Sequence, residues 1–291
     1  MVELRIAVGH DHPYAGLQTG LQINQTRKVR TQHAREAVTR VQSVIAILAK
    51  LAVAGTVMFG AAAHAAEIKV IGSPGTKEPY TLLVPDFEKA SGHKVVTIWD
   101  GVNNVHKRVA GGEVADVVMV PVAQIDDLIR QGKLVPDSRV VVATSGVGVA
   151  IRAGAPKPEM TAEGIKQALL KAKSIAYSQG PSGVHIARLI EKWGIADAVR
   201  AKIVPPRSGM PIGEVVARGE AEIGFQQVSE LLPVKGIDYL GPLPPDINEI
   251  TAFAAAVHKA ASVPDAGRAL LKFLTAPAAA ATIRKTGMEP G

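Results

Sequence analysis

From residue 66 to residue 291, short apolar segments typical of strands alternate with segments whose apolar residues recur at helical spacing. The run 115–120 is almost continuously apolar, which is typical of a strand buried on both faces of a parallel sheet. The alternation predicts an α/β fold with mostly parallel sheets and helices on both faces. So many alternating units exceed what one small sheet can hold, and we therefore expect two lobes.

Two segments have the composition of crossings between such lobes. The first is 144–150, where the β-rich stretch 140–151 is interrupted at Ser145 and Gly146, and the second is 241–250, which is rich in proline. A chain that crosses at both places would form lobe 1 from residues 66–146 plus 247–291, and lobe 2 from residues 147–246.

The first 65 residues have the composition of an export leader. Residues 44–63 are apolar except for Lys50 and Thr56, and the Ala-His-Ala sequence at 63–65 fits the small-x-small pattern of a signal-peptidase site. We expect cleavage after Ala65, which would release a mature chain into the periplasm without stable membrane insertion. The alternative is an uncleaved membrane anchor, because the apolar stretch approaches the ~20 residues that span a bilayer.

Charge and cysteine content argue against several functional classes. The chain carries 33 Lys and Arg against 26 Asp and Glu, and removal of residues 1–65 leaves 26 against 23. These charges are scattered and no basic cluster is interleaved with aromatic residues, so we expect no nucleic-acid partner. The absence of cysteine excludes disulfides, thiolate metal sites and a cysteine nucleophile. The histidines show no metal-ligand spacing, so neither a metal nor a cofactor is expected.

Two turns between a predicted strand and a predicted helix are the first candidates for a binding site. The turn at 72–76 offers Ser73, Gly75 and Thr76, and the turn at 180–183 offers Ser182 and Gly183. Free N–H groups at a helix start attract anions, small residues allow close approach, and hydroxyls add hydrogen bonds. Because the two turns fall in different predicted lobes, they could grip one small anion from opposite sides. The alternative for each turn is ordinary helix capping by Thr76 or Ser182.

Three further segments could contribute to the same cleft. Gly101 and Asn103 follow a predicted strand, and Gln227 and Ser229 follow another, with Gln226 in a supporting position. The segment 207–210, which begins with Arg207, also follows an extended stretch and could place a positive charge or small residues there. The alternatives are a turn with an Asx cap, a solvated pair of amides and a solvated arginine.

Signals for catalysis are weaker, since neither a Gly-x-Ser-x-Gly turn nor a phosphate-binding Walker loop is present. If the chain is an enzyme, we expect its acid or base to be His185 or Asp100, because both lie close to the candidate turns. Glu230 is a further carboxylate close to one of these turns. The alternative for His185 is a polar residue in the first turn of a helix.

Several motifs together resemble the molybdate-binding-like family of bacterial extracellular solute-binding proteins. They are the segments 217–224, 225–230, 241–244, 193–195 and 287–288, together with the turn at Ser182 and Gly183. The resemblance implies a type II periplasmic-binding fold, in which hinged lobes close on a ligand. It also implies a monomer that holds a small anion through N–H groups and hydroxyls, for delivery to an ABC permease. On this basis Ser73, Ser182 and Gly183 would contact the ligand.

The chain departs from the molybdate-binding pattern at three places. It has Gly-Ser-Pro at 72–74 in place of an Ala-Ala-Ser-like turn, and Asp100-Gly101 in place of a second serine. It has Gln-Gln-Val-Ser at 226–229 in place of a segment with a tyrosine nearby. An organic acid therefore stays open beside a molybdate-like oxyanion. The same family looks to include an exported aconitate isomerase, so the alternative function is isomerisation of a small unsaturated polycarboxylate on the same fold.

Overall fold

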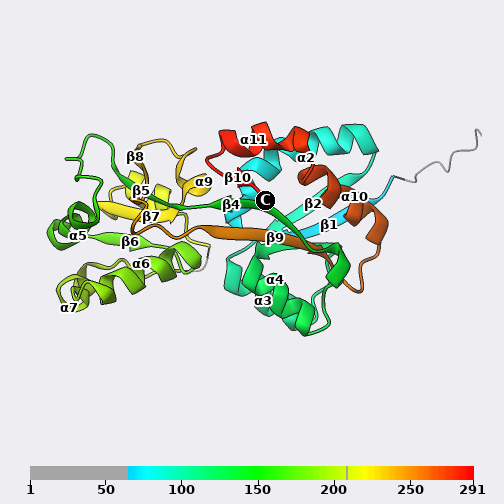
Figure 1. Ribbon diagram of the computed structural model, residues 1–291, viewed down its shortest axis with the longest axis horizontal. Coiled ribbons are helices and arrows are strands. Elements are labelled where there is room, and N and C mark those ends of the chain that lie inside the picture. The colour runs from blue at the N-terminus through cyan, green and yellow to red at the C-terminus, as the bar shows by residue number, and fades with distance from the viewer. Residues whose placement is uncertain (1–64, 208) are drawn as a thin grey trace, which may run out of the picture. The chain divides into compact units, whose positions relative to one another are not determined.

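The computed structural model describes residues 65–207 and 209–291, which form two β-sheets covered by helices (Figure 1). The strands are β1 (Glu67–Gly72), β2 (Lys94–Trp99), β3 (Val117–Pro121), β4 (Val140–Ser145), β5 (Val147–Arg152), β6 (Ile175–Tyr177), β7 (Ile223–Gln227), β8 (Ile237–Pro242), β9 (Thr251–Val257) and β10 (Glu289–Pro290). The first sheet has the order β10-β4-β9-β3-β1-β2, and the second has the order β6-β7-β5-β8. The predicted α/β class is confirmed.

The α-helices of the described residues connect these strands. They are α2 (Lys77–Ser91), α3 (Val102–Ala110), α4 (Val122–Arg130), α5 (Ala162–Lys171), α6 (Pro181–Lys192), α7 (Ala196–Val199), α8 (Ile212–Ala217), α9 (Val228–Leu231), α10 (Pro264–Leu274) and α11 (Ala280–Lys285). Short 3-10 turns add η1 (Pro74–Thr76), η2 (Pro136–Ser138), η3 (Arg200–Lys202) and η4 (Pro277–Ala279). None of the helices in this part of the chain is long and apolar enough to span a bilayer.

Strand pairing is mixed, which corrects the expectation of mostly parallel sheets. β1 pairs in parallel with β2 and β3, and β6 pairs in parallel with β7. β9 is antiparallel to both β3 and β4, and β5 is antiparallel to both β7 and β8. The physical reason lies in the connections. Helical crossovers produce the parallel pairs, whereas the strands that carry the chain from one sheet to the other run against their neighbours.

The chain changes sheets twice. It leaves the first sheet at the end of β4, enters the second at β5 after the single residue Gly146, and returns to the first with β9. β4 and β9 pair along residues 140–145 and 251–255, so two adjacent strands reach towards the second sheet (Figure 1). Both changes fall within the segments 144–150 and 241–250 that the sequence favoured for crossings. The exact lobe boundaries stay a prediction.

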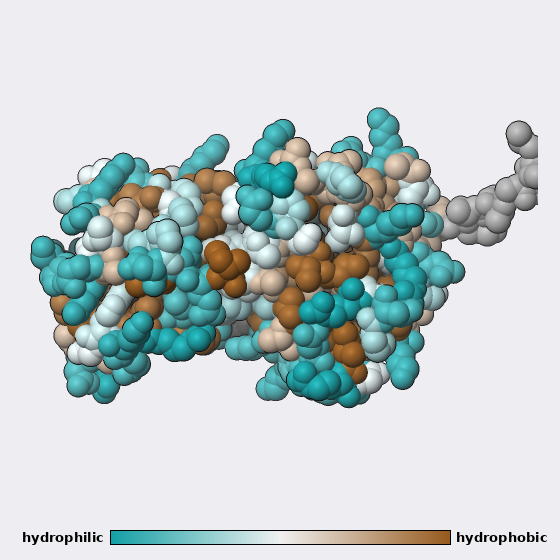
Figure 2. All heavy atoms as spheres, viewed as in Figure 1, coloured by the Kyte–Doolittle hydropathy of each residue, from teal (hydrophilic) through white to brown (hydrophobic). Residues whose placement is uncertain are grey.

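Aliphatic side chains fill the space on both faces of each sheet. One cluster joins the first sheet to α2, α10 and α11, and a second joins its other face to α3 and α4. The second sheet packs against α5, α6 and α7 on one face and against α8 on the other. On the side drawn in Figure 2, hydrophilic residues dominate the surface and apolar residues emerge in smaller groups. This burial, together with an aromatic content of only 4%, explains the continuous Val, Ile and Ala runs of the strands.

Glycine, threonine and proline define three of the helix boundaries. Gly92 ends α2 in the left-handed conformation with φ of 76°, and Thr161 begins α5 by accepting the Gly164 N–H at 3.0 Å. Ser182 was wrong as a cap. α6 begins one residue earlier at Pro181, with Gly180 as its N-cap, because proline lacks an N–H and its φ suits the first helical position.

Thr76 occupies the N-cap position of α2, but its hydroxyl makes no capping bond. It donates instead to the backbone oxygen of Ser73 at 3.3 Å. The predicted leader and the residues upstream of its cleavage site lie outside the described residues.

Candidate functional site

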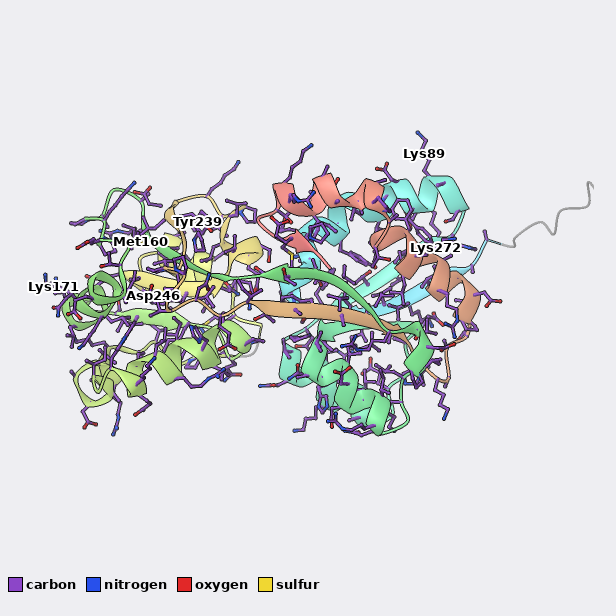
Figure 3. The ribbon with its side chains drawn as sticks, in the orientation of Figure 1. Lys89, Met160, Lys171, Tyr239, Asp246 and Lys272 are labelled. Atoms are coloured by element: carbon purple, nitrogen blue, oxygen red, sulfur yellow. The ribbon has the colours of Figure 1, made fainter. Side chains whose placement is uncertain are left out.

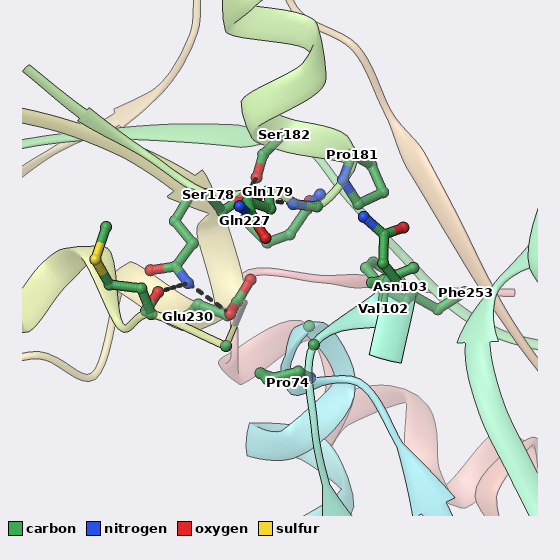
Figure 4. A pocket seen from close by; sticks show the side chains of 16 residues that line it. Pro74, Val102, Asn103, Ser178, Gln179, Pro181, Ser182, Gln227, Glu230 and Phe253 are labelled. Atoms are coloured by element: carbon green, nitrogen blue, oxygen red, sulfur yellow. Dashed lines mark hydrogen bonds between the residues drawn. The ribbon is translucent and has the colours of Figure 1, made fainter. Parts of the chain in front are cut away.

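A cavity lies where the N-termini of α3 and α6 meet the turn before α2 (Figure 4). Its empty volume is about 470 Å³, part of which is open to solvent. The first sheet and its connections contribute Pro74, Gly75, Gly101, Val102, Asn103 and Phe253 to the lining. The second sheet and its connections contribute Ser178, Gln179, Gly180, Pro181, Ser182, Gly209, Met210, Gln226, Gln227 and Glu230. The cavity therefore has two walls, one from each sheet.

The turn before α6 forms the hydroxyl-bearing part of the cavity. The Oγ atoms of Ser178 and Ser182 lie 3.0 Å apart, and the backbone N–H of Gly180 donates to Ser178 Oγ at 3.2 Å. No hydrogen bond among the described residues uses the backbone N–H of Ser182 or Gly183, as expected for the first turn of a helix. This turn can therefore offer backbone N–H groups and hydroxyls to one ligand.

The start of α3 approaches the same cavity from the other wall. A side-chain carbon added at Gly180 would lie 3.9 Å from Val102 Cγ2, and one added at Gly209 would lie 3.7 Å from the Gly101 nitrogen. The start of α6 and the segment before α8 therefore both lie close to the start of α3. Asn103 is exposed, which places its amide at the solvent side of the cavity. Both helices direct the positive ends of their dipoles towards this region.

Charged side chains are scarce in the lining. Among its described residues, there is no lysine or arginine and Glu230 is the only ionisable group. The exposed side chains of Lys89, Lys171 and Lys272, labelled in Figure 3, do not line the cavity. An anion bound there would be held by N–H groups, amides and hydroxyls, which can provide such binding without a formal positive charge.

Glu230 has the most perturbed carboxyl group of the cavity. Burial raises the pKa of Glu230 to about 7, although hydrogen bonds from the Gln227 backbone and the Gln226 side chain oppose the shift. The Gln226 Nε2 donates to Glu230 Oε1 at 2.8 Å, while Gln226 Oε1 accepts the N–H of Ile212 at 2.9 Å. A carboxyl with such a pKa changes its protonation state near neutral pH.

Half of the ten predicted ligand-contact residues line the cavity. These are Gly75, Gly101, Asn103, Ser182 and Gln227. The other five are Ser73, Thr76, Gly183, Arg207 and Ser229, and none of them is part of the lining. The structure thus brings residues from all five proposed segments together, because Gly209 and Met210 of the segment 207–210 line the cavity, although Arg207 itself is exposed and is not part of the lining.

The turn at 72–76 is mostly used for internal packing. Ser73 is fully buried, its N–H donates to the backbone oxygen of Met119 at 2.9 Å, and its Oγ has no partner among the described residues. Ser229 Oγ donates to the backbone oxygen of Gly75 at 2.7 Å, which ties α9 to this turn. A side-chain carbon at Gly75 would lie 2.4 Å from Phe253 Cζ. Glycine is therefore required there for the contact with the ring.

Gly183 and Gln227 also have clear structural roles. A side-chain carbon at Gly183 would lie 1.5 Å from the backbone oxygen of Ser178, so only glycine allows the turn to close. The Gln227 amide lies 3.1 Å from Thr251 Oγ1. Oriented with its nitrogen towards the backbone oxygens of Ser145 and Gly146, both 3.2 Å away, it bridges the two strands that pass between the sheets.

Neither residue expected to act in catalysis lines the cavity. His185 is held by the backbone oxygen of Ile247 at 2.7 Å and by Glu249 at 2.9 Å. Asp100 accepts from Gly101 and Asn104 and pairs with Arg108, and these hydrogen bonds lower its pKa against the opposing effect of burial. Within the described residues, no group of three or more His, Asp or Glu side chains could hold a metal ion.

Sequence reasoning missed several lining residues. Ser178 and Gln179 come directly after β6, and a rule that examined strand ends rather than helix starts would have found them. Phe253 had no such signal, because an apolar residue in a cavity wall looks like a core residue in the sequence. Glu230 was recognised only by its position near a candidate turn.

Comparisons with known proteins agree with this architecture. The family profile described as bacterial extracellular solute-binding protein matches residues 68–289. The chain is 36% identical to a protein named aconitate isomerase from a Pseudomonas species, over 77% of this chain and 87% of that protein. It is 28% identical to the molybdate-binding protein ModA of Azotobacter vinelandii, over 63% of this chain and 74% of that protein.

A solved structure supports the fold. The periplasmic molybdate-binding protein of Azotobacter vinelandii superposes with a TM-score of 0.65 at 22% sequence identity, covering 77% of this chain and 99% of that one. The predicted type II periplasmic-binding fold is confirmed by this likeness.

Proposed function

Because the chain belongs to the family of bacterial extracellular solute-binding proteins, we propose that its cavity binds a small organic acid anion. The observation that carries the proposal is the meeting of two helix N-termini, those of α3 and α6, at one cavity with no basic side chain among its described lining residues. Such a site suits a ligand whose negative charges are spread over several carboxylate oxygens. Each oxygen can then accept from a different N–H, amide or hydroxyl.

The composition of the lining favours an organic acid over a tetrahedral oxyanion. Beside its polar groups, the cavity has an apolar portion formed by Pro74, Val102, Pro181, Met210 and Phe253. An oxyanion such as molybdate has a wholly polar surface and gains nothing from contact with these side chains. The hydrocarbon part of a di- or tricarboxylate does gain from it, because apolar surface is removed from water on both partners.

We further propose that the protein works outside the cytoplasm as the substrate-binding partner of an ABC permease, and that it acts as a monomer. The family supports export and a small ligand. Export would follow cleavage after Ala65. Ligand delivery would use relative movement of the proposed lobes, 66–146 plus 247–291 and 147–246, about the two connecting segments.

A thermal-shift screen tests the binding proposal. The purified protein is heated with molybdate, tungstate, sulfate, phosphate and a set of di- and tricarboxylates. A ligand at 100 times its Kd adds about 2.7 kcal/mol of stability, which is easily detected. We expect carboxylates to stabilise the protein and oxyanions to have little effect. Stabilisation by molybdate and tungstate alone would contradict the organic-acid proposal and support the oxyanion alternative.

A second candidate function is isomerisation of a small unsaturated polycarboxylate. The observation that favours it is the 36% identity to a protein named aconitate isomerase, together with an ionisable carboxyl in the cavity lining, Glu230. Moving a double bond along such an acid requires removal of a proton from one carbon and its return to another. One carboxyl of suitable pKa within reach of both carbons can perform both steps.

Incubation of the protein with cis-aconitate separates the two functions. An isomerase would form trans-aconitate, detected by chromatography, and Glu230→Gln would lose this activity while still binding the acid. Stable binding of cis-aconitate without any conversion by the unaltered protein would rule out isomerisation of this substrate and leave the binding function.

A further inference from the structure

We propose that Glu230 contacts the bound acid as a neutral carboxylic acid, donating its O–H to a ligand carboxylate, so that binding above neutral pH takes up a proton. The inference rests on the proposed function, because it requires an anionic ligand in the cavity. It adds a role for a residue of the cavity wall and makes ligand affinity depend on pH.

The position of Glu230 carries the first part of the argument. It lines the cavity from α9 (Figure 4), and its Oε1 accepts a hydrogen bond from Gln226 Nε2 at 2.8 Å. The remaining described lining residues are uncharged at every pH at which the protein works. An ionised Glu230 would therefore face an anionic ligand with no positive side chain in the lining to offset the repulsion.

The orientation of Gln226 fixes how this carboxyl can be protonated. The backbone N–H of Ile212 can only donate, so the Gln226 oxygen must face it at 2.9 Å and the Gln226 nitrogen must face Glu230. Oε1 of Glu230 thus accepts a hydrogen bond from Gln226, and the Gln227 backbone N–H donates a second one to the carboxyl. We place the proton of the neutral acid on Oε2. A protonated carboxyl in this orientation keeps one O–H to donate to a ligand.

The surroundings of α9 provide no charge that would keep Glu230 ionised. The elements packed against α9 are η1, α2, α8, β5, β7 and β8, and η1 and β7 have no ionisable side chain. The others carry Lys77, Glu78, Tyr80, Asp86, Glu88, Lys89, Arg152, Glu214, Asp238 and Tyr239. None of these contributes to the raised pKa of Glu230, which burial causes.

The size of the pH effect on ligand affinity follows from the linkage between proton binding and ligand binding. With the pKa of the free protein at about 7, Glu230 is half protonated at pH 7 and almost fully ionised at pH 9. If only the protonated form binds well, affinity falls by roughly fifty-fold between these values. Carboxylic acids of the ligand titrate mostly below this range and contribute little to the change.

Calorimetric titration of the purified protein with tricarballylate, a saturated tricarboxylate that cannot isomerise, tests the inference. We expect Kd to rise by about fifty-fold from pH 7 to pH 9, and about one proton to be taken up at pH 8. Proton uptake is read from the heats in two buffers of different ionisation enthalpy. Glu230→Gln keeps a donor in place of the O–H, so it should bind with a Kd that is constant over this range.

The matched control is Glu214→Gln on α8, where the glutamate is exposed and paired with Arg218. This variant should keep the pH dependence of the unaltered protein. Binding of tricarballylate with a constant Kd and no proton uptake would overturn the inference and leave the proposed function intact. A Glu230 pKa near 4.5 in the ligand-free protein, measured by carboxyl NMR, would overturn it without reference to any ligand. Failure of every carboxylate to bind would instead contradict the proposed function.

Discussion

The two walls of the cavity differ in what they offer a ligand. The wall from the first sheet consists of backbone, proline, valine and a phenylalanine ring, and Asn103 provides its only polar side chain among the described residues. The wall from the second sheet contains two serines, three glutamines and Glu230. Both walls end in a helix N-terminus, from α3 on one side and α6 on the other.

Two turns of similar composition therefore need not have the same role. The turns at 72–76 and 180–183 each combine glycine, proline and serine between a strand and a helix. In the first, Ser73 is buried below the lining and Gly75 packs on Phe253. In the second, Ser182 lines the cavity and bonds another lining serine, Ser178. We infer that the first wall shapes the site and the second selects the ligand.

The largest effect is expected at the turn of the second wall. Gly183→Ala would place a methyl group 1.5 Å from the backbone oxygen of Ser178. The backbone cannot yield without opening the helix start, so we expect a loss of more than about 4 kcal/mol in unfolding free energy. Urea denaturation measures this. Gly180→Ala is the matched control, since its added carbon meets nothing closer than 3.6 Å. Equal stability of the two variants would show that the turn is not as tightly closed as described.

The next effect concerns the ionisable group of the second wall. The pKa of Glu230 is raised from 4.5 to about 7 in the folded protein, so protonation stabilises the fold. This contribution is fully present below about pH 4.5 and is lost as pH rises through about 7. The free energy of unfolding of Glu230→Gln, relative to that of the unaltered protein, should therefore rise by up to about 3 kcal/mol between pH 5 and pH 8.

Thermal or urea unfolding over this pH range measures that gain. Comparison of the two proteins is needed because burial lowers the pKa of His258, which destabilises the fold at acidic pH in both. Glu214→Gln should follow the unaltered protein at every pH. A stability difference between Glu230→Gln and the unaltered protein that does not change with pH would show that Glu230 has no raised pKa.

Much of the fold could be predicted because hydrophobic periodicity and glycine placement act locally. The strands at 94–99 and 251–257 and the interruption at Gly146 follow directly from apolar runs and a single break. The antiparallel pairing of β9 could not be predicted in the same way. It depends on where the chain returns after visiting the second sheet, which is a long-range property.

The candidate site was predictable only in part for a related physical reason. Sequence shows which turns expose N–H groups, but not which hydroxyl faces a cavity and which faces the core. Ser73 precedes the proline of its turn and lies outside the lining, whereas Ser182 follows the proline of its turn and lines the cavity. Gln227 looked like a ligand contact, and its amide also reaches Thr251 on a strand distant in sequence.

A smaller effect is expected on the first wall. Gly75→Ala would bring a methyl group to 2.4 Å from Phe253 Cζ, a clash with a ring rather than with backbone. The ring can shift, so we expect a loss of about 2 kcal/mol in unfolding free energy. Phe253→Leu should relieve part of it, giving a coupling of about 1 kcal/mol in a double-mutant cycle measured by urea denaturation. Strict additivity of the two substitutions would mean that Gly75 and Phe253 do not pack as described.

The smallest effect tests the contrast between the two walls most directly. Ser182→Ala removes a hydroxyl from the cavity, and we expect a loss of about 1 kcal/mol in ligand binding. Ser73→Ala removes a buried hydroxyl that has no partner among the described residues, so binding should stay unchanged and stability should not fall. Calorimetric titration with tricarballylate compares the two variants. If Ser73→Ala weakened binding as much as Ser182→Ala, the first turn would also contact the ligand through its hydroxyl, and selection would be shared by both walls.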